Sequence, residues 1–210
     1  MTARKGLGEG LAALRALGMP VPDSALAVRA GELIVDVAPR FLVNHSVRAY
    51  AWAIELAWHE GLEVDPEILY VSALLHDIGL VPAYDIGGCF EVDGAVAAER
   101  FALEQGEPEE RARAISDVIA MHMLAAAPAG STSEVVLLND STGVDVTGYR
   151  IGDVRQDSIP AVVAAYPRLD FKRDFAAAFV DQATRKPACR VAEMVATGKL
   201  EAIANAPFES

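Results

Sequence analysis

The chain has 210 residues, a hydrophobic content of 52% and a formal net charge of -12 at pH 7. This length fits one domain, and this apolar content is enough for one large core. The negative charge argues against binding of nucleic acid or of an anionic membrane surface, because both require clustered Lys and Arg.

Neither a secretory signal nor a membrane-spanning segment is visible in the sequence. No apolar run approaches the roughly 18 residues of a transmembrane helix, and the N-terminus lacks the apolar region of a signal peptide. Cys89 and Cys189 lie far apart in the sequence and form no Cys-x-x-Cys pair. We therefore predict a cytoplasmic protein with two reduced cysteines.

Apolar residues recur at helical spacing along the chain, and Pro, Gly and capping residues separate the periodic segments. We expect an N-terminal extension over residues 1–22 and a single domain over residues 23–210. Helices are predicted within 1–20 and over about 25–37, 40–60, 66–77, 91–105, 108–124, 134–146, 158–165, 171–185 and 188–196. No convincing alternating strand appears, even at the strand-like residues 135–138. The prediction is an all-α bundle of about 8–10 helices.

Three of the four histidines take the place of an apolar residue on the inward stripe of a different helix: His45, His76 and His122. Any one of them alone is most simply a hydrogen-bonded core histidine. Three together, one of them followed directly by Asp77, fit a metal site built from facing helices. His59 lies about 21 Å along the helix from His45 at 1.5 Å per residue, so it cannot share this metal.

Several segments resemble the HD-domain superfamily of metal-dependent phosphohydrolases, and more narrowly its cyanamide hydratase-like branch. They are residues 44–50 (NHSVRAY), 74–79 (LLHDIG), 90–95 (FEVDGA), 145–150 (DVTGYR), and 166–168 (YPR) with 186–187 (KP). The resemblance covers roughly residues 25–195. It implies an HD-domain helical bundle, with His45, His76, Asp77 and Asp145 as metal ligands. Asp140 competes with Asp145 for the last position.

Two imidazoles and two carboxylates suit one divalent ion, with zinc favoured and iron or manganese as alternatives. Such an ion would lower the pKa of bound water and yield hydroxide near neutral pH. His122 is expected to act as a proton donor or as a group beside the ligands, or else to bind a second metal. A di-iron centre would need two further histidines, and this chain offers one.

Two charged residues are further candidates for the catalytic site. Arg48 either binds an anionic substrate or pairs with a buried acid such as Glu91 or Asp93. Glu91 either shapes the substrate pocket or caps the next helix. Cys89 lacks a plausible base, so we expect it to be inert.

The sequence leaves the substrate open among three hypotheses. Residues 49–99 contain no Lys or Arg, which favours a small neutral substrate over a nucleotide. The first hypothesis is therefore a hydratase or hydrolase of a cyanamide-like or nitrile-like compound. The second is a phosphohydrolase of a nucleoside monophosphate or other phosphomonoester, with Arg48 on the phosphate. The third is a metal-binding sensor without turnover. A homo-oligomer is possible in each case.

Overall fold

The computed structural model describes residues 2–209, with residues 2–5 described by their backbone only, and this part of the chain is helical without a strand. The α-helices are α1 (Thr2–Ala16), α2 (Ala25–Val37), α3 (Arg40–Glu60), α4 (Pro66–Leu75), α5 (Phe90–Glu104), α6 (Glu109–Met121), α7 (Ser133–Thr147), α8 (Ser158–Ala165), α9 (Phe171–Arg185), α10 (Arg190–Ala196) and α11 (Leu200–Ala204). Short 3-10 helices are η1 (Ile78–Leu80), η2 (Pro82–Tyr84) and η3 (Ile151–Asp153). The predicted all-α class is confirmed.

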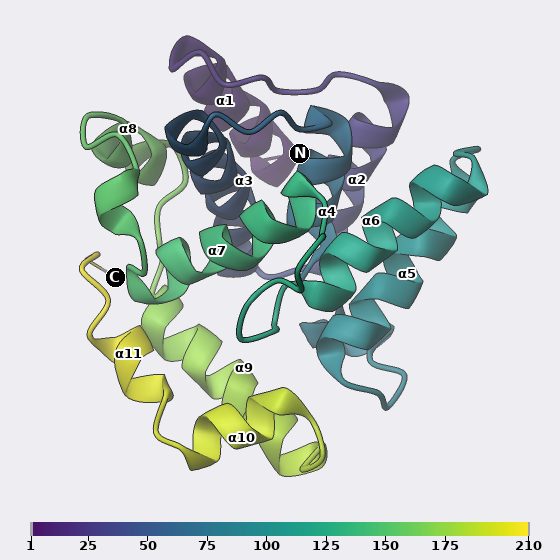
Figure 1. Ribbon diagram of the computed structural model, residues 1–210, viewed down its shortest axis with the longest axis vertical. Coiled ribbons are helices and arrows are strands. Elements are labelled where there is room, and N and C mark those ends of the chain that lie inside the picture. The colour runs from purple at the N-terminus through teal and green to yellow at the C-terminus, as the bar shows by residue number, and fades with distance from the viewer. Residues whose placement is uncertain (1, 210) are drawn as a thin grey trace.

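Helix α3 lies at the centre of the bundle and packs against α2, α4, α7, α8 and α9 (Figure 1). Its residues from Leu42 to Ala57 are all buried, as expected for a helix covered on every side. The hairpin of α5 and α6 flanks the bundle, and α9, α10 and α11 form a separate layer at its lower end (Figure 1). Within residues 2–209, no helix combines the length and apolar character needed to cross a membrane.

The predicted helix ends are set by the expected capping chemistry. The Ser24 side chain accepts a hydrogen bond from the Ala27 amide at 3.1 Å, and α2 begins after it. Asp65 caps α4 in the same way, with Pro66 at the first helical position. Gly61 ends α3 with φ of 67°, a left-handed conformation that glycine adopts without steric cost.

Helix α7 forms across the strand-like residues 135–138 because its apolar side chains pack at helical spacing. Val135, Leu138 and Val144 are buried in the main core, which outweighs the β propensity of the valines. The predicted helix is confirmed here.

Helix α11 was not anticipated from the sequence. It has five residues, too few for a periodic pattern to be recognised. Its Ile203 is buried in a second apolar cluster with Phe90, Phe175 and Phe179, so packing against α9 stabilises the helix. The structure thus has eleven α-helices among the described residues, above the predicted 8–10.

Helix α1, in the predicted N-terminal extension, packs on the same core as the rest of the chain. Leu14 is fully buried in that core, and Tyr166 donates a hydrogen bond to the Leu7 carbonyl at 2.9 Å. The boundary at residue 22 stays a prediction.

The two cysteines form a disulfide, which corrects the prediction that both are reduced. Cys89 directly precedes α5 and Cys189 directly precedes α10, and their Cα atoms are 5.4 Å apart. Their separation of 100 residues in the sequence gave no indication of this contact. The disulfide ties the α9–α11 layer to the main bundle, beside an ion pair of 2.9 Å between buried Lys186 and Asp85.

Gly79 lets the turn after Asp77 lie directly on the start of α5. A Cβ atom at this position would overlap the Phe90 carbonyl oxygen and stand 2.9 Å from the Gly94 amide nitrogen. Both neighbours are backbone atoms, so a local side-chain movement cannot relieve the overlap. Gly79 and Gly94 thereby fix the position of the His76–Asp77 pair.

We predict that Gly79→Ala lowers the free energy of unfolding by about 2 kcal/mol or more, because the added methyl group overpacks a backbone contact. Urea unfolding of the variant measures this loss. Gly8→Ala is the matched control, since no atom lies within 4 Å of the added Cβ and Ala favours the helix α1. Equal effects of the two substitutions would refute the packing argument.

Candidate metal centre

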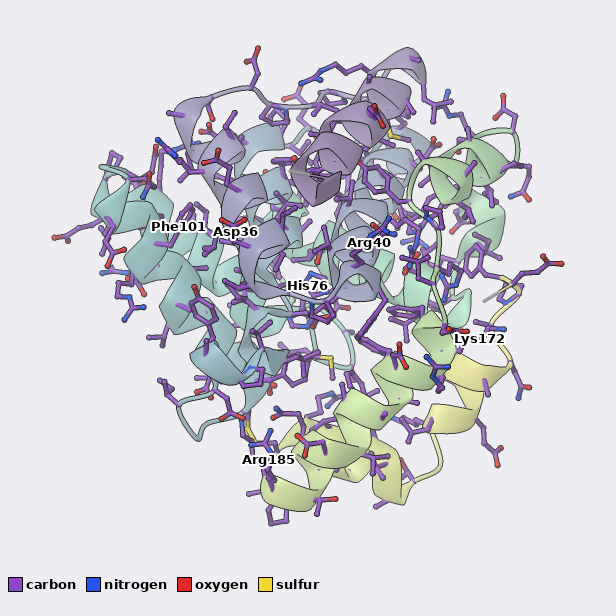
Figure 2. All side chains as sticks on the ribbon, turned by 180° about the vertical axis from the view of Figure 1, so that it is seen from behind. Asp36, Arg40, His76, Phe101, Lys172 and Arg185 are labelled. Carbon is purple, nitrogen blue, oxygen red and sulfur yellow. A yellow bond between two sulfur atoms is a disulfide. The ribbon has the colours of Figure 1, made fainter. Side chains whose placement is uncertain are left out.

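Three residues from two helices bring potential metal ligands together in the interior. His45 lies on α3, His76 lies at the end of α4, and Asp77 follows it. Each is at most 1% exposed, and Figure 2 shows His76 near the middle of the molecule. The Nε2 atoms of His45 and His76 are 3.1 Å apart, and Asp77 Oδ2 lies 3.4 and 3.1 Å from them.

Hydrogen bonds at the opposite ring nitrogens fix the tautomer of the histidines. His76 Nδ1 is 2.8 Å from the Ala73 carbonyl, and His122 Nδ1 is 2.6 Å from the Ile119 carbonyl. Because a carbonyl oxygen can only accept, each Nδ1 carries the proton and each neutral ring keeps a lone pair on Nε2. His45 Nδ1 lies 2.7 Å from a carboxylate oxygen of Asp145, which favours the same tautomer.

This arrangement fits a divalent metal ion. The Nε2 lone pairs face Asp77 Oδ2, which is buried and has no hydrogen-bond partner. At metal–ligand distances of about 2.0–2.2 Å, neighbouring ligand atoms are separated by roughly 3 Å, close to the separations found here. A cation among these atoms would offset the cost of burying opposed lone pairs and a carboxylate.

His122 adjoins this cluster from α6. It is 4% exposed, and its Nε2 is 3.6 Å from Asp77 Oδ1. The imidazole therefore presents its free nitrogen to the cluster, as a proton-transfer group would. The role of His122 as a proton donor, as a group beside the ligands or as a ligand of a second metal stays a prediction.

Asp145 is placed differently from the predicted ligand set. Its carboxylate bonds the far ring nitrogen of His45 and is not among the ligand atoms that His45, His76 and Asp77 bring within 4.8 Å of one another. Two nitrogens of Arg48 donate to it at 2.8 Å, and Trp52 Nε1 donates at 2.9 Å. This geometry is that of a carboxylate that orients a metal-binding histidine, and the predicted role of Asp145 as a ligand stays a prediction.

Asp140, the alternative ligand, is also outside the cluster. It borders the same cavity, but its Oδ2 lies 2.6 Å from Arg150 in an ion pair. The structure therefore brings neither aspartate of α7 to the Nε2 side of His45.

The comparisons with known proteins identify the family of this chain. The HD domain family model matches residues 42–159, which include His45, His76, Asp77 and Asp145. The chain belongs to the HD domain family. It is similar to the cyanamide hydratases DDI2 and DDI3 of Saccharomyces cerevisiae, each 25% identical over 178 residues, 80% of this chain and 77% of the relative. The predicted resemblance to the cyanamide hydratase-like branch of the HD domain family is confirmed.

Opposing influences set the charge states at this HD-domain site. Burial lowers the pKa of His45, but the carboxylates of Asp145 and Asp77 outweigh it and raise the pKa overall. For His76, burial outweighs the neighbouring Asp77 and lowers the pKa, which favours the neutral ring. Burial raises the pKa of Asp77, yet the surrounding imidazoles, His76 above all, hold it well below its usual value. The neutral ring of His76 beside the ionised Asp77 is the form that binds metal.

Arg48 is fully buried and pairs with Asp145, so it pairs with a buried acid, as one of the two alternatives predicted, but this acid is neither Glu91 nor Asp93. Its Nε and Nη2 donate to the Asp145 carboxylate and its Nη1 donates to the Tyr166 carbonyl at 2.9 Å, and it does not line the cavity at the cluster. Arg168, which the sequence did not assign to the site, donates to the Asp145 carbonyl at 3.0 Å. Arg48 and Arg168 thus balance the charge of the buried Asp145, and a role of Arg48 at the substrate stays a prediction.

Glu91 is not among the residues that line the cavity, and its Oε2 is buried without a hydrogen-bond partner. Asp93 accepts hydrogen bonds from the amides of Ile86 and Gly88, each at 3.1 Å. It therefore organises the loop before α5. The structure gives neither acid a contact with the cluster.

A cavity of about 450 Å³ opens onto the cluster. His45, His76, Asp77 and His122 form one part of its lining. Apolar walls come from Met123, Val146, Phe175, Phe179 and Met194. His59 lies outside it with its side chain 51% exposed, in agreement with its predicted exclusion from the site. The cavity thus combines buried metal-capable groups with apolar walls.

Proposed function

We propose that the protein is a metal-dependent hydratase or hydrolase that adds water to a small electrophilic carbon–nitrogen compound such as cyanamide or a nitrile. The observation that carries the proposal is the converging Nε2 and Asp77 Oδ2 atoms at the base of an apolar cavity. The similarity to the two yeast cyanamide hydratases supports the choice of substrate class.

In this proposal His45, His76 and Asp77 hold one divalent ion. Zinc suits two imidazoles and one carboxylate, and iron or manganese are alternatives. When bound, such an ion supplies a Lewis acid that activates water near neutral pH. Asp145 keeps the His45 ring in place through Nδ1, so that its Nε2 points to the ion.

The remaining residues orient the substrate and handle its protons. Water adds across the carbon–nitrogen multiple bond, with its oxygen going to carbon and its hydrogens to nitrogen, and cyanamide yields urea. His122 has its Nδ1–H fixed on the Ile119 carbonyl, so its Nε2 is the atom free to carry a proton to the substrate nitrogen. Phe175 and Phe179 line the cavity beside these groups and supply apolar contact surface for the substrate.

Urea formation from cyanamide by protein loaded separately with zinc, iron or manganese tests this function. We expect turnover with one of these metals and none after chelation. A panel of nitriles and p-nitrophenyl phosphate is assayed in parallel. Absence of turnover on cyanamide and every nitrile, together with clear phosphatase activity, would refute the proposal.

The second candidate function is a phosphohydrolase. In that case Arg190 and Lys199 would bind the phosphate group, the role that the sequence suggested for Arg48. These two cations line the cavity, whereas Arg48 is buried against Asp145. Arg48→Ala is therefore no test of phosphate binding, because it removes the partner of a buried carboxylate. A metal-binding sensor without turnover would instead bind the ion and fail on the whole panel. The predicted cytoplasmic location and homo-oligomer stay predictions.

A further inference from the structure

Two cations from the C-terminal layer line the cavity without a carboxylate partner. Arg190 begins α10, and Lys199 directly precedes α11. No ion pair forms at either side chain among residues 2–209, although the chain carries a net charge of -12. By contrast, Arg111 and Arg150 are each paired with three carboxylates. The cavity therefore presents two unpaired cations, the partly buried Arg190 and the exposed Lys199, apart from Asp77 in the cluster and Asp140 in its pair with Arg150.

The position of Arg190 has no evident structural purpose. Its Nε is buried and lacks a hydrogen-bond partner, which is unfavourable for a polar atom. A cation at the first position of a helix also opposes the helix dipole. The preceding residue, Cys189, is held by the disulfide to Cys89, so the start of α10 is covalently fixed at the cavity. These features are typical of a side chain placed to bind a ligand.

The cavity is also much larger than cyanamide, whose heavy atoms are one carbon and two nitrogens. Its volume of about 450 Å³ lies within the range of sites that bind larger organic ligands. Phe175, Phe179 and Met194 provide the apolar contact surface that the body of such a ligand would need. Size and charge together indicate a ligand with an apolar body and an anionic group.

We propose that the physiological substrate is a carbon–nitrogen compound larger than cyanamide, with a carboxylate or phosphate group bound by Arg190 and Lys199 and an apolar body against Phe175, Phe179 and Met194. This inference rests on the proposed function in taking the cavity as the active site. It reverses the neutral-substrate expectation drawn from residues 49–99. The positive charges that residues 49–99 lack are supplied by Arg190 and Lys199, about a hundred residues later in the sequence.

Isothermal titration calorimetry of the metal-loaded protein with hexanoate, hexyl phosphate and hexanamide tests the charge preference. The three probes share an apolar body and differ in the head group. We expect at least one anion to bind at least about 10-fold more tightly than hexanamide, as charge-assisted hydrogen bonds allow. The tighter of the two anions identifies carboxylate or phosphate as the preferred group.

Substitutions of Arg190 show whether the anion binds to this side chain or to the metal. Arg190→Gln should weaken binding of the preferred anion by about 10-fold and leave the affinity for hexanamide the same. Arg190→Lys should retain part of the preference for the anion over hexanamide. Arg113→Gln is the matched control, because Arg113 is exposed on α6 and does not line the cavity. Circular dichroism verifies that each variant is folded.

Two results would overturn the inference. One is equal affinity for hexanamide and both anions. The other is anion binding that Arg190→Gln leaves unchanged, which would place the anion on the metal. Because binding is measured without turnover, a protein inactive on cyanamide and nitriles can still pass this test. A protein that hydrates cyanamide but shows no anion preference would overturn this inference alone.

Discussion

Asp77→Asn is expected to abolish stable metal binding and, with it, the proposed activity. The substitution keeps the shape of the side chain but removes the charged oxygen that faces His45 and His76 at 3.4 and 3.1 Å. Loss of groups that only support metal ligands typically costs 10–100-fold in metal affinity, so loss of a ligand should cost more than about 100-fold. Metal content after dialysis and the dissociation constant for zinc measure the effect.

The thermal stability of the same variant gives a readout that does not depend on turnover. A ligand at 100 times its dissociation constant stabilises the folded state by about 2.7 kcal/mol, so zinc should raise the melting temperature of the native protein. Zinc should leave the melting temperature of Asp77→Asn unchanged. His59→Gln serves as the control, since His59 is exposed and distant from the cluster. An equal zinc response in Asp77→Asn and the native protein would contradict the assigned site.

Asp145→Asn is expected to destabilise the fold by about 3–5 kcal/mol, the usual cost of removing one partner from a buried ion pair. The side chain is fully buried, and its negative charge balances Arg48 and Arg168, which are at most 2% exposed. The amide can still accept a hydrogen bond, but it leaves those positive charges uncompensated. Urea unfolding measures the loss.

Asp140→Asn is the matched control on the same helix. Asp140 pairs with Arg150, which keeps Glu60 and Asp153 as partners, so we expect a loss below about 1 kcal/mol. Similar losses of unfolding free energy in the two variants would show that the buried charge of Asp145 does not stabilise the fold.

Metal affinity of Asp145→Asn then distinguishes an orienting group from a ligand. Acting through His45 Nδ1, Asp145 should change metal affinity by about 10–100-fold. A loss as large as that of Asp77→Asn would restore Asp145 to the ligand set that the sequence indicated.

The sequence alone determined most of the helices and which histidines point inward. Helices α2, α3, α8 and α9 have the predicted bounds, because their periodic apolar residues and their caps act within a few positions of each other. The same local periodicity placed His45, His76 and His122 on buried faces.

Only the tertiary structure decided which groups meet across the bundle. Helical spacing put Asp145 on an inward face, but the packing of α3 against α7 sets which nitrogen of His45 it reaches. Cys89 and Cys189 meet across 100 residues, and Arg190 reaches the cavity beside them. Such contacts depend on how whole helices pack against each other. Residue spacing along one helix carries no information about the distance to a residue on another helix.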